Sequence, residues 1–590
     1  MTTRSLAAKM HSPFGGAVAV ALVCLVTWCR TLHDGYVNYD TPWLVTHNPL
    51  LTTGAVSVIP TLFTDLSLGT RMTLGAEFLP LRDLSVLLDF AVFGDWWFGH
   101  HLQNLAWYTG GCVAFLFVMR SLLGSGWRAL LGALLFAVHP THLECVGWLA
   151  SRKDVMGLAF FWLAMLTGLR GGAGAWWSAL LALFAIWSKN LTITLPILLM
   201  LTVWAIDRKR WQGRWALAIA LHTIVVVGTL KLSFSVGDTV QMTIPSRAAG
   251  LAELVVLQGR MLMHYAESLI WPPSLSPWYP EPEFLPLKQA ANVQGMALYV
   301  ALVGAMPWFV WRGNRRAALG ILWGLVTLAP VFQLVPLQNL LADRYLMLPL
   351  GGVALTLAAV LPANRVTGWI SGLVLLLLSI SSIQVSGIWQ SSEALWKTAA
   401  DRYPSHLRST VAWAGAVHER DPTAARAIYE GALRDHPNSP LLHNAYGTTL
   451  LALGLEEPAL AAWQHALSLD PTHKKALHNR MVQLTRVGRP AEALALGQTL
   501  TNLYPTYIDG WDGLATTYIA LDDGSRALVA AERALALAPH RAASWCNLGS
   551  AHFLGSDFDS ARAAWQRCAH LDPENPYPQR GLQALEERAN

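Results

Sequence analysis

Residues 541–575 read RAASWCNLGSAHFLGSDFDSARAAWQRCAHLDPEN and indicate how the last third of the chain folds. Bulky apolar residues alternate with a glycine and an alanine, at places where two packed helices must approach each other closely. A proline near the end of the stretch stops the second helix, because proline has no backbone N–H to donate. The stretch therefore predicts a pair of packed helices. The residues that carry this pattern are Trp545, Leu548, Gly549, Ala561, Trp565 and Pro573.

The same unit recurs upstream at a fixed period. Pro437, Pro471, Pro505, Pro539 and Pro573 are each 34 residues apart, and Pro404 precedes the first of them by 33. This period is typical of the tetratricopeptide repeat (TPR), whose helix pairs stack into a solenoid. We expect five repeats over 406–575 and a C-terminal cap that ends at Asn590. Such an array offers a concave surface for an extended polypeptide, or alternatively for docking the rest of the chain or another copy of it.

The composition indicates that the remaining two thirds lie in a membrane. Of the 590 residues, 53% are hydrophobic and 13% are charged, whereas about a quarter of the residues are charged in soluble domains. Apolar runs dominate up to residue 390, and from Asp401 onward charges are dense. The formal net charge of +5 is spread along the chain and does not indicate nucleic-acid binding.

Eleven apolar segments are suitable for transmembrane helices. They run over 13–30, 100–119, 128–147, 153–170, 174–188, 191–206, 215–232, 293–311, 317–338, 345–361 and 366–386. The first follows basic residues, as in a signal peptide, but no cleavage site follows it, so we interpret it as an uncleaved span. The amphipathic segment 251–271 is predicted to be an interfacial helix rather than a span.

Basic residues in short loops predict the orientation, because positive charge resists translocation. With eleven spans, all the basic clusters fall on one side, which is then the cytoplasm. The outer loops 31–99 and 233–292 and everything after residue 387 lie on the other side. The clusters comprise Arg4, Lys9, Arg208, Lys209, Arg210, Arg214, Arg312, Arg315 and Arg316, with Arg120, Arg128, Arg170 and Arg365 in other tight turns.

The six cysteines, at 24, 29, 112, 145, 546 and 568, show no spacing suited to a zinc site. Cys546 and Cys568 fall in one repeat and could form a disulfide in an oxidising compartment. Packed free thiols are the default expectation.

Ionisable residues gather at the predicted outer ends of the spans, where such groups mark function or pairing. A pocket that mixes carboxylates with cations suits a reaction on a lipid with an anionic head. The cations would hold a phosphate, and a carboxylate would take a proton. The residues are Tyr39, Asp40, Arg82, Asp83, His139, His142, Glu144, Arg152, Lys153, Asp154, Ser188, Lys189, Asp343, Arg344 and Tyr345.

Structural interpretations compete with this functional one. Charged residues at helix ends can form ion pairs that take no part in chemistry. The structural alternatives are ion pairs of Arg152 with Asp154 and of Asp343 with Arg344, a helix cap or kink at His139, and a Lys189 side chain that reaches from a helix end to the headgroups.

Taken in order, the polar motifs resemble those of the transmembrane and tetratricopeptide-repeat O-mannosyltransferases and their bacterial relatives, members of the GT-C glycosyltransferases. The resemblance covers nearly the whole chain. The motifs are Asn38-Tyr39-Asp40, Asn48-Pro49, Pro80-Leu81-Arg82, His101-Leu102-Gln103-Asn104, His139-Pro140-Thr141-His142-Leu143-Glu144, Ser151-Arg152-Lys153-Asp154, Ser188-Lys189, Thr194-Leu195-Pro196, Trp278-Tyr279-Pro280, Ala342-Asp343-Arg344-Tyr345 and the segment Trp389 to Trp396.

The resemblance implies an all-α chain in three parts. A polytopic GT-C-like transmembrane domain occupies 1–390, a connector occupies 391–405, and a TPR α-solenoid occupies 406–590. It also implies an integral protein of the bacterial inner membrane whose TPR domain is periplasmic.

The activity implied is the transfer of a sugar, typically mannose, from a polyprenyl-phosphate donor to Ser or Thr hydroxyls of extracytoplasmic polypeptides, with the TPR array binding the acceptor. The first outer loop of the family usually carries two adjacent acidic residues. Here Asp40 matches the first, but Thr41 occupies the second position. One carboxylate suffices as general base when the acceptor hydroxyl attacks and the lipid phosphate leaves from the opposite face.

In this interpretation Asp40 is catalytic, and Arg152, Lys189 and Arg344 neutralise the leaving phosphate. The remaining donor-site candidates are Arg82, His139, His142, Glu144, Asp154, Asp343 and Tyr345. No cofactor is required. A divalent metal near Asp40 and Glu144 is an open alternative, although no residue spacing demands one. The main alternative is a non-catalytic, membrane-anchored TPR scaffold for periplasmic partners, which Thr41 favours. Transport is a weaker alternative, because no pair of interrupted spans with inverted-repeat character is evident.

Overall fold

The computed structural model describes residues 12–124, 126–206, 215–240, 250–280, 290–337 and 339–589. Within these ranges the chain is helical and has no strand, so the predicted all-α class is confirmed. The chain divides into two compact units, Met1–Arg402 and Tyr403–Asn590. Some basic residues used for the predicted orientation lie outside the described ranges, namely Arg4, Lys9, Arg208, Lys209, Arg210 and Arg214.

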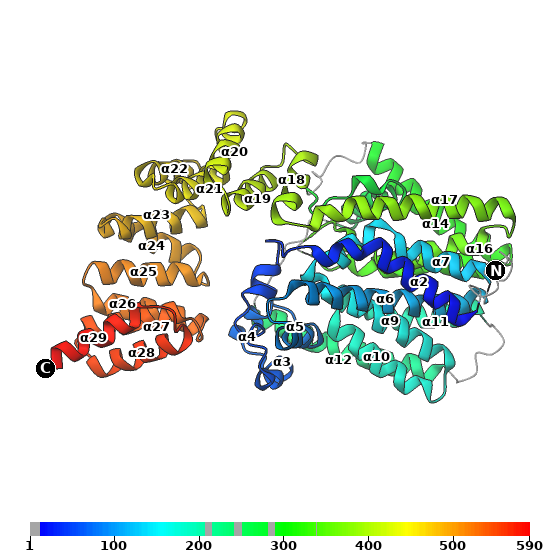
Figure 1. Cartoon of the computed structure of the whole chain (residues 1–590), viewed down its shortest axis with the longest axis horizontal. Helices are drawn as coiled ribbons and strands as arrows, with labels where there is room; N and C mark the ends of the chain where they lie inside the picture. Colours follow the sequence, from blue (N-terminus) through cyan, green and yellow to red (C-terminus); the bar gives the residue numbers. More distant parts are fainter. Residues whose placement is uncertain are drawn as a thin grey trace. The chain divides into compact units, whose positions relative to one another are not determined.

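The first unit is a bundle of helices (Figure 1). Its α-helices are α2 (Pro13–Trp28), α3 (Ile59–Thr64), α4 (Leu68–Thr73), α5 (Pro80–Phe93), α6 (Trp97–Leu123), α7 (Trp127–Val138), α8 (Leu143–Gly147), α9 (Arg152–Arg170), α10 (Gly174–Ser188), α11 (Leu195–Ile206), α12 (Ala216–Val240), α13 (Leu251–Ile270), α14 (Ala290–Trp311), α15 (Arg315–Leu328), α16 (Pro349–Val360), α17 (Arg365–Val385) and α18 (Ser392–Arg402).

Five described helical segments are long and apolar enough to cross a membrane, namely Pro13–His33, Trp97–Leu123, Ala216–Gly237, Asn292–Trp311 and Arg365–Trp389. Large apolar side chains on their surfaces are exposed, as a lipid-facing surface requires. On α17, for example, Trp369 is 81% exposed and Leu373 is 57% exposed. The protein is therefore a membrane protein.

The other predicted spans contain shorter or interrupted helices. The polar motifs interrupt them: α7 ends just before His139-Pro140, and the chain bends by 51° into the segment Pro140–Gly147. Proline cannot donate the backbone hydrogen bond that would continue α7. Shorter apolar helices occupy Gly174–Ser188, Asn190–Ile206 and Pro349–Val360, while α9 and α15 lie in the predicted ranges 153–170 and 317–338. The count of eleven spans and the interfacial placement of α13 stay predictions.

A buried arginine joins three helices of this unit. Arg152, the first residue of α9, is 2% exposed and donates to Asp89 on α5 at 2.6 Å. It also donates to Ser85 at 2.9 Å and to the His100 carbonyl at 2.8 Å, and it contacts the side-chain oxygens of Gln103 and Asn104. The guanidinium therefore ties α5 to α6 and α9.

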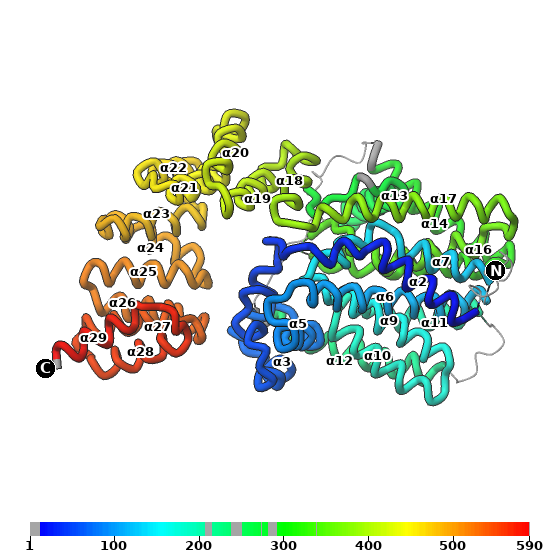
Figure 2. Tube along the Cα trace, viewed as in Figure 1, coloured from blue at the N-terminus to red at the C-terminus, as the bar shows by residue number. Residues whose placement is uncertain are grey.

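The second unit consists of antiparallel helix pairs that stack in chain order, as the tube in Figure 2 shows. The pairs are α19 (Leu407–His418) with α20 (Pro422–Asp435), α21 (Pro440–Ala452) with α22 (Glu456–Leu469), α23 (Lys474–Arg486) with α24 (Pro490–Leu503), α25 (Ile508–Ala520) with α26 (Gly524–Leu537), and α27 (Ala542–Leu554) with α28 (Phe558–Leu571); α29 (Tyr577–Ala589) follows.

The close approach of paired helices explains the repeated glycines. A Cβ atom on Gly549 would lie 2.5 Å from Cδ1 of Trp565, and one on Gly447 would lie 2.7 Å from Nε1 of Trp463. Such distances are too short for any side chain to fit without moving the indole. Glycine therefore allows the tryptophan of the second helix to pack directly on the backbone of the first.

The sulfur atoms of Cys546 and Cys568 form a disulfide between α27 and α28. The default expectation of free thiols is therefore wrong for this pair, whereas Cys24, Cys29, Cys112 and Cys145 are free. The disulfide closes a loop with a sequence separation of 22 residues, and so restricts the unfolded chain.

We predict that Arg152→Gln lowers the free energy of unfolding by about 3–5 kcal/mol, because Asp89 would remain buried without its cation. The measurement is unfolding of the purified protein in detergent micelles. Arg365→Gln is the matched control: Arg365 is exposed, so its replacement should change stability by less than about 0.5 kcal/mol. Equal effects of the two substitutions would contradict the role assigned to Arg152.

We predict that Cys546→Ser lowers the free energy of unfolding of the second unit by about 2–4 kcal/mol in the oxidised protein. Differential scanning calorimetry in the absence of reductant measures this change. Under reducing conditions the difference between the variant and the wild type should shrink. Cys29→Ser is the control, because Cys29 is an exposed free thiol of the other unit.

Candidate active site

Asp40 lies in the predicted outer loop, between α2 and α6, and its neighbour Tyr39 anchors that loop. The Tyr39 ring is 5.2 Å from the ring of Trp148, 6.3 Å from that of Trp389 and 5.4 Å from that of Trp396, measured between centroids. Edge-to-face and tilted contacts of this kind stabilise aromatic clusters. The motif around residue 39 and the tryptophans at 389 and 396 therefore act together to hold Asp40 in place.

Hydrogen bonds fix the residues on both sides of this pair. Asn38 accepts a bond from the Trp396 indole at 2.8 Å, and its backbone N–H donates to Ser392 at 2.9 Å. Thr41, which is fully buried, accepts a bond from the Trp148 indole at 3.0 Å. The residue that replaces the expected second acid thus has a structural role in this chain.

The Asp40 carboxyl is half-buried between cations. Burial raises its pKa above the usual value for aspartate, and the positive charges of Lys153 and Arg344 oppose that rise. Trp43 donates a hydrogen bond to the carboxyl and also favours its ionised form. Asp40 is therefore poised as a proton acceptor whose pKa is higher than that of a free aspartate.

A second carboxylate, Glu77, lies near Asp40. Glu77 accepts from Lys153 at 2.9 Å and from Arg82 at 2.8 Å, and Arg82 also pairs with Asp83 at 2.7 Å. Burial alone would raise the pKa of Glu77, but Lys153 and Arg82 lower it to about 2. Glu77 is therefore ionised at neutral pH.

Glu77 was not predicted from the sequence as a site residue, and Lys153 was not predicted to lie at the donor site. Lys153 stands inside the motif Ser151-Arg152-Lys153-Asp154, and Glu77 precedes Pro80-Leu81-Arg82 by three residues. These positions next to known motifs are the only features of the sequence that point to Lys153 and Glu77. Nothing in the predicted outer loop indicates which acid packs against α9.

Lys189 and Asp154 form an ion pair at 2.8 Å between the end of α10 and the first turn of α9. Asp154 also accepts from the Ser151 hydroxyl at 2.9 Å. The Lys189 side chain is 12% exposed. It is thus held at the protein interior and does not extend to lipid headgroups, so that structural alternative is wrong.

Arg344 pairs with Glu144 through its guanidinium, and its backbone N–H donates to the same carboxylate at 2.8 Å. The guanidinium lies 5.5 Å from the centre of the Trp148 ring and 5.2 Å from that of Tyr345, as cation–π contacts require. Trp148, which also bonds to Thr41, thus connects the Asp40 loop to Arg344.

Arg152 and Asp343 have partners other than those in the two ion pairs proposed as structural alternatives. Arg152 pairs with Asp89, and Asp343 accepts a hydrogen bond from the Tyr279 hydroxyl at 2.7 Å. All the guanidinium nitrogens of Arg152 have partners within the protein, so a phosphate could contact it only by displacing one of them. That Arg152 neutralises the phosphate stays a prediction, and the hydrogen bonds of its guanidinium do not support it.

The two predicted histidines are buried within the first unit. His139 contacts the Thr141 hydroxyl at 2.9 Å and the Leu269 carbonyl at 3.1 Å, and its ring also caps the turn that starts at Pro140. His142 contacts the Tyr108 hydroxyl at 2.8 Å. These contacts agree with the structural alternative of a cap at His139, and contact with a sugar stays a prediction for both.

Lys189 and Arg344 line the same cleft. Its other walls are Asp154, Leu158, Leu191, Thr192, Thr327, Tyr345, Met347 and Leu348. The cleft combines two cations with leucine and methionine side chains, which suits a phosphate attached to a hydrocarbon chain. It is nearly closed, with a volume of about 20 Å³, so these side chains must separate before a ligand of that size can enter.

Most of the predicted site residues therefore meet at one end of the bundle. Trp148 contacts both neighbours of Asp40 and also Arg344, which pairs with Glu144. Lys189 and Asp154 join Arg344 at the cleft. Arg170, at the other end of α9, is about 27 Å from Arg152 at 1.5 Å of rise per residue.

No group of three or more His, Cys, Asp or Glu residues in the described ranges could hold a metal ion. That the transfer needs no metal stays a prediction.

Comparison with family models agrees with the repeat architecture. A family model described as "Tetratricopeptide repeat" matches residues 513–576. Among solved structures, the TPR protein YrrB is similar, with 13% sequence identity and a TM-score of 0.28, over 32% of this chain and 97% of that one. MamA is 19% identical with a TM-score of 0.25, over 26% and 91% of the two chains.

Curated relatives include protein O-mannosyl-transferases. Tmtc1 of Drosophila melanogaster is 29% identical over 195 residues, which are 32% of this chain and 22% of that protein. Human TMTC4 is 28% identical over 27% of this chain and 24% of that protein, and mouse TMTC2 is 33% identical over 15% and 11%. The chain thus spans less than a quarter of the length of each of these relatives. The chain is thus similar, over part of its length, to protein O-mannosyl-transferases of the TMTC group.

Proposed function

We propose that the chain is a GT-C type glycosyltransferase. It transfers a sugar, mannose by analogy with the names of its relatives, from a polyprenyl-phosphate donor to Ser or Thr hydroxyls of extracytoplasmic polypeptides. One observation carries the proposal. Lys189 and Arg344 line one cleft with apolar walls, and Asp40 lies within electrostatic reach of Arg344.

In the proposed reaction Asp40 takes the proton of the acceptor hydroxyl. The hydroxyl oxygen forms a bond to the anomeric carbon while the bond from that carbon to the phosphate oxygen breaks. The lipid phosphate leaves with the electron pair, and Lys189 and Arg344 neutralise the charge that develops on it. Glu144 does not block this role, because an arginine has five N–H donors and Glu144 uses only part of them.

The neighbouring residues support this arrangement without contacting the reacting atoms. Glu77 holds Lys153 near Asp40, and Thr41 holds Trp148 beneath Arg344. Leu158, Leu191 and Met347 provide an apolar wall for the first part of a polyprenyl chain. Because the cleft is nearly closed, donor binding opens it, and closure afterwards excludes water from the phosphate.

The TPR unit is proposed to bind the acceptor polypeptide and to be periplasmic in a bacterial inner-membrane protein. The Cys546–Cys568 disulfide supports an extracytoplasmic location, because disulfides persist in oxidising compartments and are rare in the cytosol.

We predict that Asp40→Asn lowers the rate of sugar transfer by about 10²- to 10⁴-fold, the usual contribution of a general base. The measurement is transfer of radiolabelled sugar from a synthetic polyprenyl-phosphate donor to purified periplasmic proteins. Asp95→Asn is the matched control, since Asp95 is an exposed acid of the same outer loop, and its activity should stay unchanged. Full activity of Asp40→Asn would contradict the mechanism and favour the non-catalytic scaffold.

We predict that kcat/KM falls as the pH falls, with a midpoint above about 3.9, the pKa of a free aspartate. The direction follows from burial, which raises the pKa of Asp40, because only the ionised carboxylate accepts a proton. The donor is a phosphodiester and does not titrate in this range. Initial rates between pH 4 and 8 test this, and the midpoint should shift in Asp40→Glu. A rate that stays flat down to pH 4 would exclude a raised pKa.

A further inference from the structure

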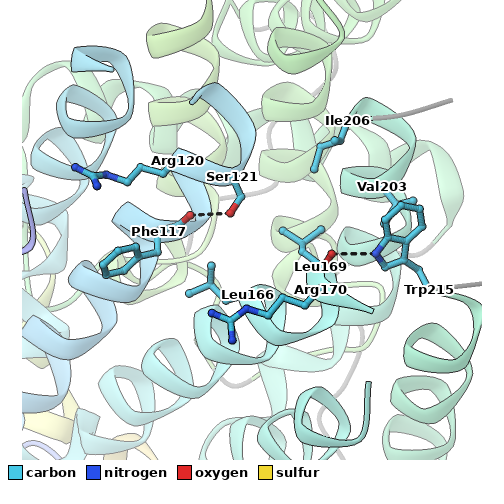
Figure 3. Close-up of a pocket in the computed structure, with 9 residues that line it drawn as sticks. All are labelled: Phe117, Arg120, Ser121, Leu166, Leu169, Arg170, Val203, Ile206 and Trp215. Atoms are coloured by element: carbon cyan, nitrogen blue, oxygen red, sulfur yellow. Dashed lines mark hydrogen bonds between the residues drawn. The ribbon is translucent and has the colours of Figure 1, made fainter. Parts of the chain in front are cut away.

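An opening that contains charged residues lies in the first unit, at the end of α9 opposite to the candidate active site. It has a volume of about 630 Å³, within the range of small-molecule sites. Figure 3 shows its lining, which comes from α6, α9, α11 and the residue before α12. The lining residues are Phe117, Arg120, Ser121, Leu166, Leu169, Arg170, Val203, Ile206 and Trp215.

A cation without a described partner stands at the rim of this cavity. Arg170, the last residue of α9, is exposed and makes no hydrogen bond or ion pair with any residue that the structure describes. Arg120, from α6, donates to the Ser12 carbonyl at 2.8 Å and lies over the Phe117 ring. No acidic side chain is among the described residues that line the cavity, and these residues give it a positive charge.

The walls of the cavity are hydrocarbon. Leu166, Val203 and Ile206 contribute aliphatic side chains, and their helices continue into the membrane bundle. The Trp215 indole donates to the Leu169 carbonyl at 3.0 Å. Tryptophan is enriched at the boundary between lipid tails and headgroups, because its apolar ring contacts the tails while its N–H group contacts polar headgroups or water. The cavity therefore presents charge at its rim and apolar surface inside.

We infer that this cavity binds an anionic phospholipid, with its phosphate against Arg170 and one acyl chain along Leu166, Val203 and Ile206. Basic pockets between transmembrane helices are suited to acidic headgroups, because they combine charge attraction with burial of the acyl chain. A soluble phosphate would leave the apolar walls exposed to water. The site is independent of the proposed transfer reaction, since the length of α9, about 27 Å, separates it from the cleft at Arg344.

The test uses the full chain reconstituted in nanodiscs of phosphatidylcholine. Binding of fluorescent phosphatidylglycerol is measured by energy transfer from protein tryptophans, with phosphatidylcholine carrying the same fluorophore for comparison. Wild type should prefer phosphatidylglycerol, and Arg170→Gln should weaken its binding about fivefold, the factor expected for one basic side chain at an anionic lipid. Leu166→Trp should also weaken binding, because it fills the cavity while the charge remains.

Arg316→Gln is the matched control, because Arg316 is exposed at the start of α15 but does not line the cavity. Binding should be unchanged in this variant. Three results would overturn the inference: an equal loss in Arg316→Gln, equal binding of the two lipids, or competition by soluble glycerol phosphate as strong as that by the whole lipid. Arg170→Gln should keep the melting temperature of the wild type, since Arg170 makes no described hydrogen bond or ion pair.

Discussion

The buried guanidinium of Arg152 holds α5 in place against α6 and α9. It pairs with Asp89 and with polar groups on α6, so that α5 packs firmly against the helices of the bundle. α5 begins close to Arg82, and Arg82 together with Glu77 and Lys153 forms the ion-pair network beside Asp40. A buried ion pair of this type is expensive to break and brings little net stability. The ion pair of Arg152 with Asp89 instead fixes the position of the carboxylates of the predicted outer loop relative to α9.

Three consecutive residues at the start of α9 illustrate what could be predicted and what could not. The motif Arg152-Lys153-Asp154 could be recognised in the sequence as polar residues at the end of a predicted helix. Because other predicted helices also end in polar residues, these helix ends could be expected to lie close together. Successive helical residues point about 100° apart, so Arg152 enters the α5 contact, Lys153 reaches Glu77 and Asp154 faces Lys189. Which of the three faces which partner depends on the fold of the outer loop, which has no periodicity to predict it. The repeats were predictable because each helix pair depends on its neighbours alone.

Thr41 changes the interpretation of the first outer loop. The absence of a second acid next to Asp40 favoured a scaffold without activity. The Thr41 hydroxyl, however, accepts a hydrogen bond from the tryptophan that lies beneath Arg344. Glu77 supplies a second carboxylate close to Asp40 from a position later in the loop. Negative charge near Asp40 is therefore present although the adjacent acid is absent. The cost of the replacement in this chain is smaller than the sequence alone suggests.

The disulfide between α27 and α28 has a consequence for how the solenoid comes apart. Stacked repeats unfold most easily from an end, because a terminal unit has only one neighbour. Here the pair α27–α28 is cross-linked, so its two helices stay tethered even when their packing is lost. Fraying that reaches this pair therefore meets a covalent stop. In a compartment rich in proteases, this pair then resists cleavage longer than the repeats between α19 and α26, which have no cross-link.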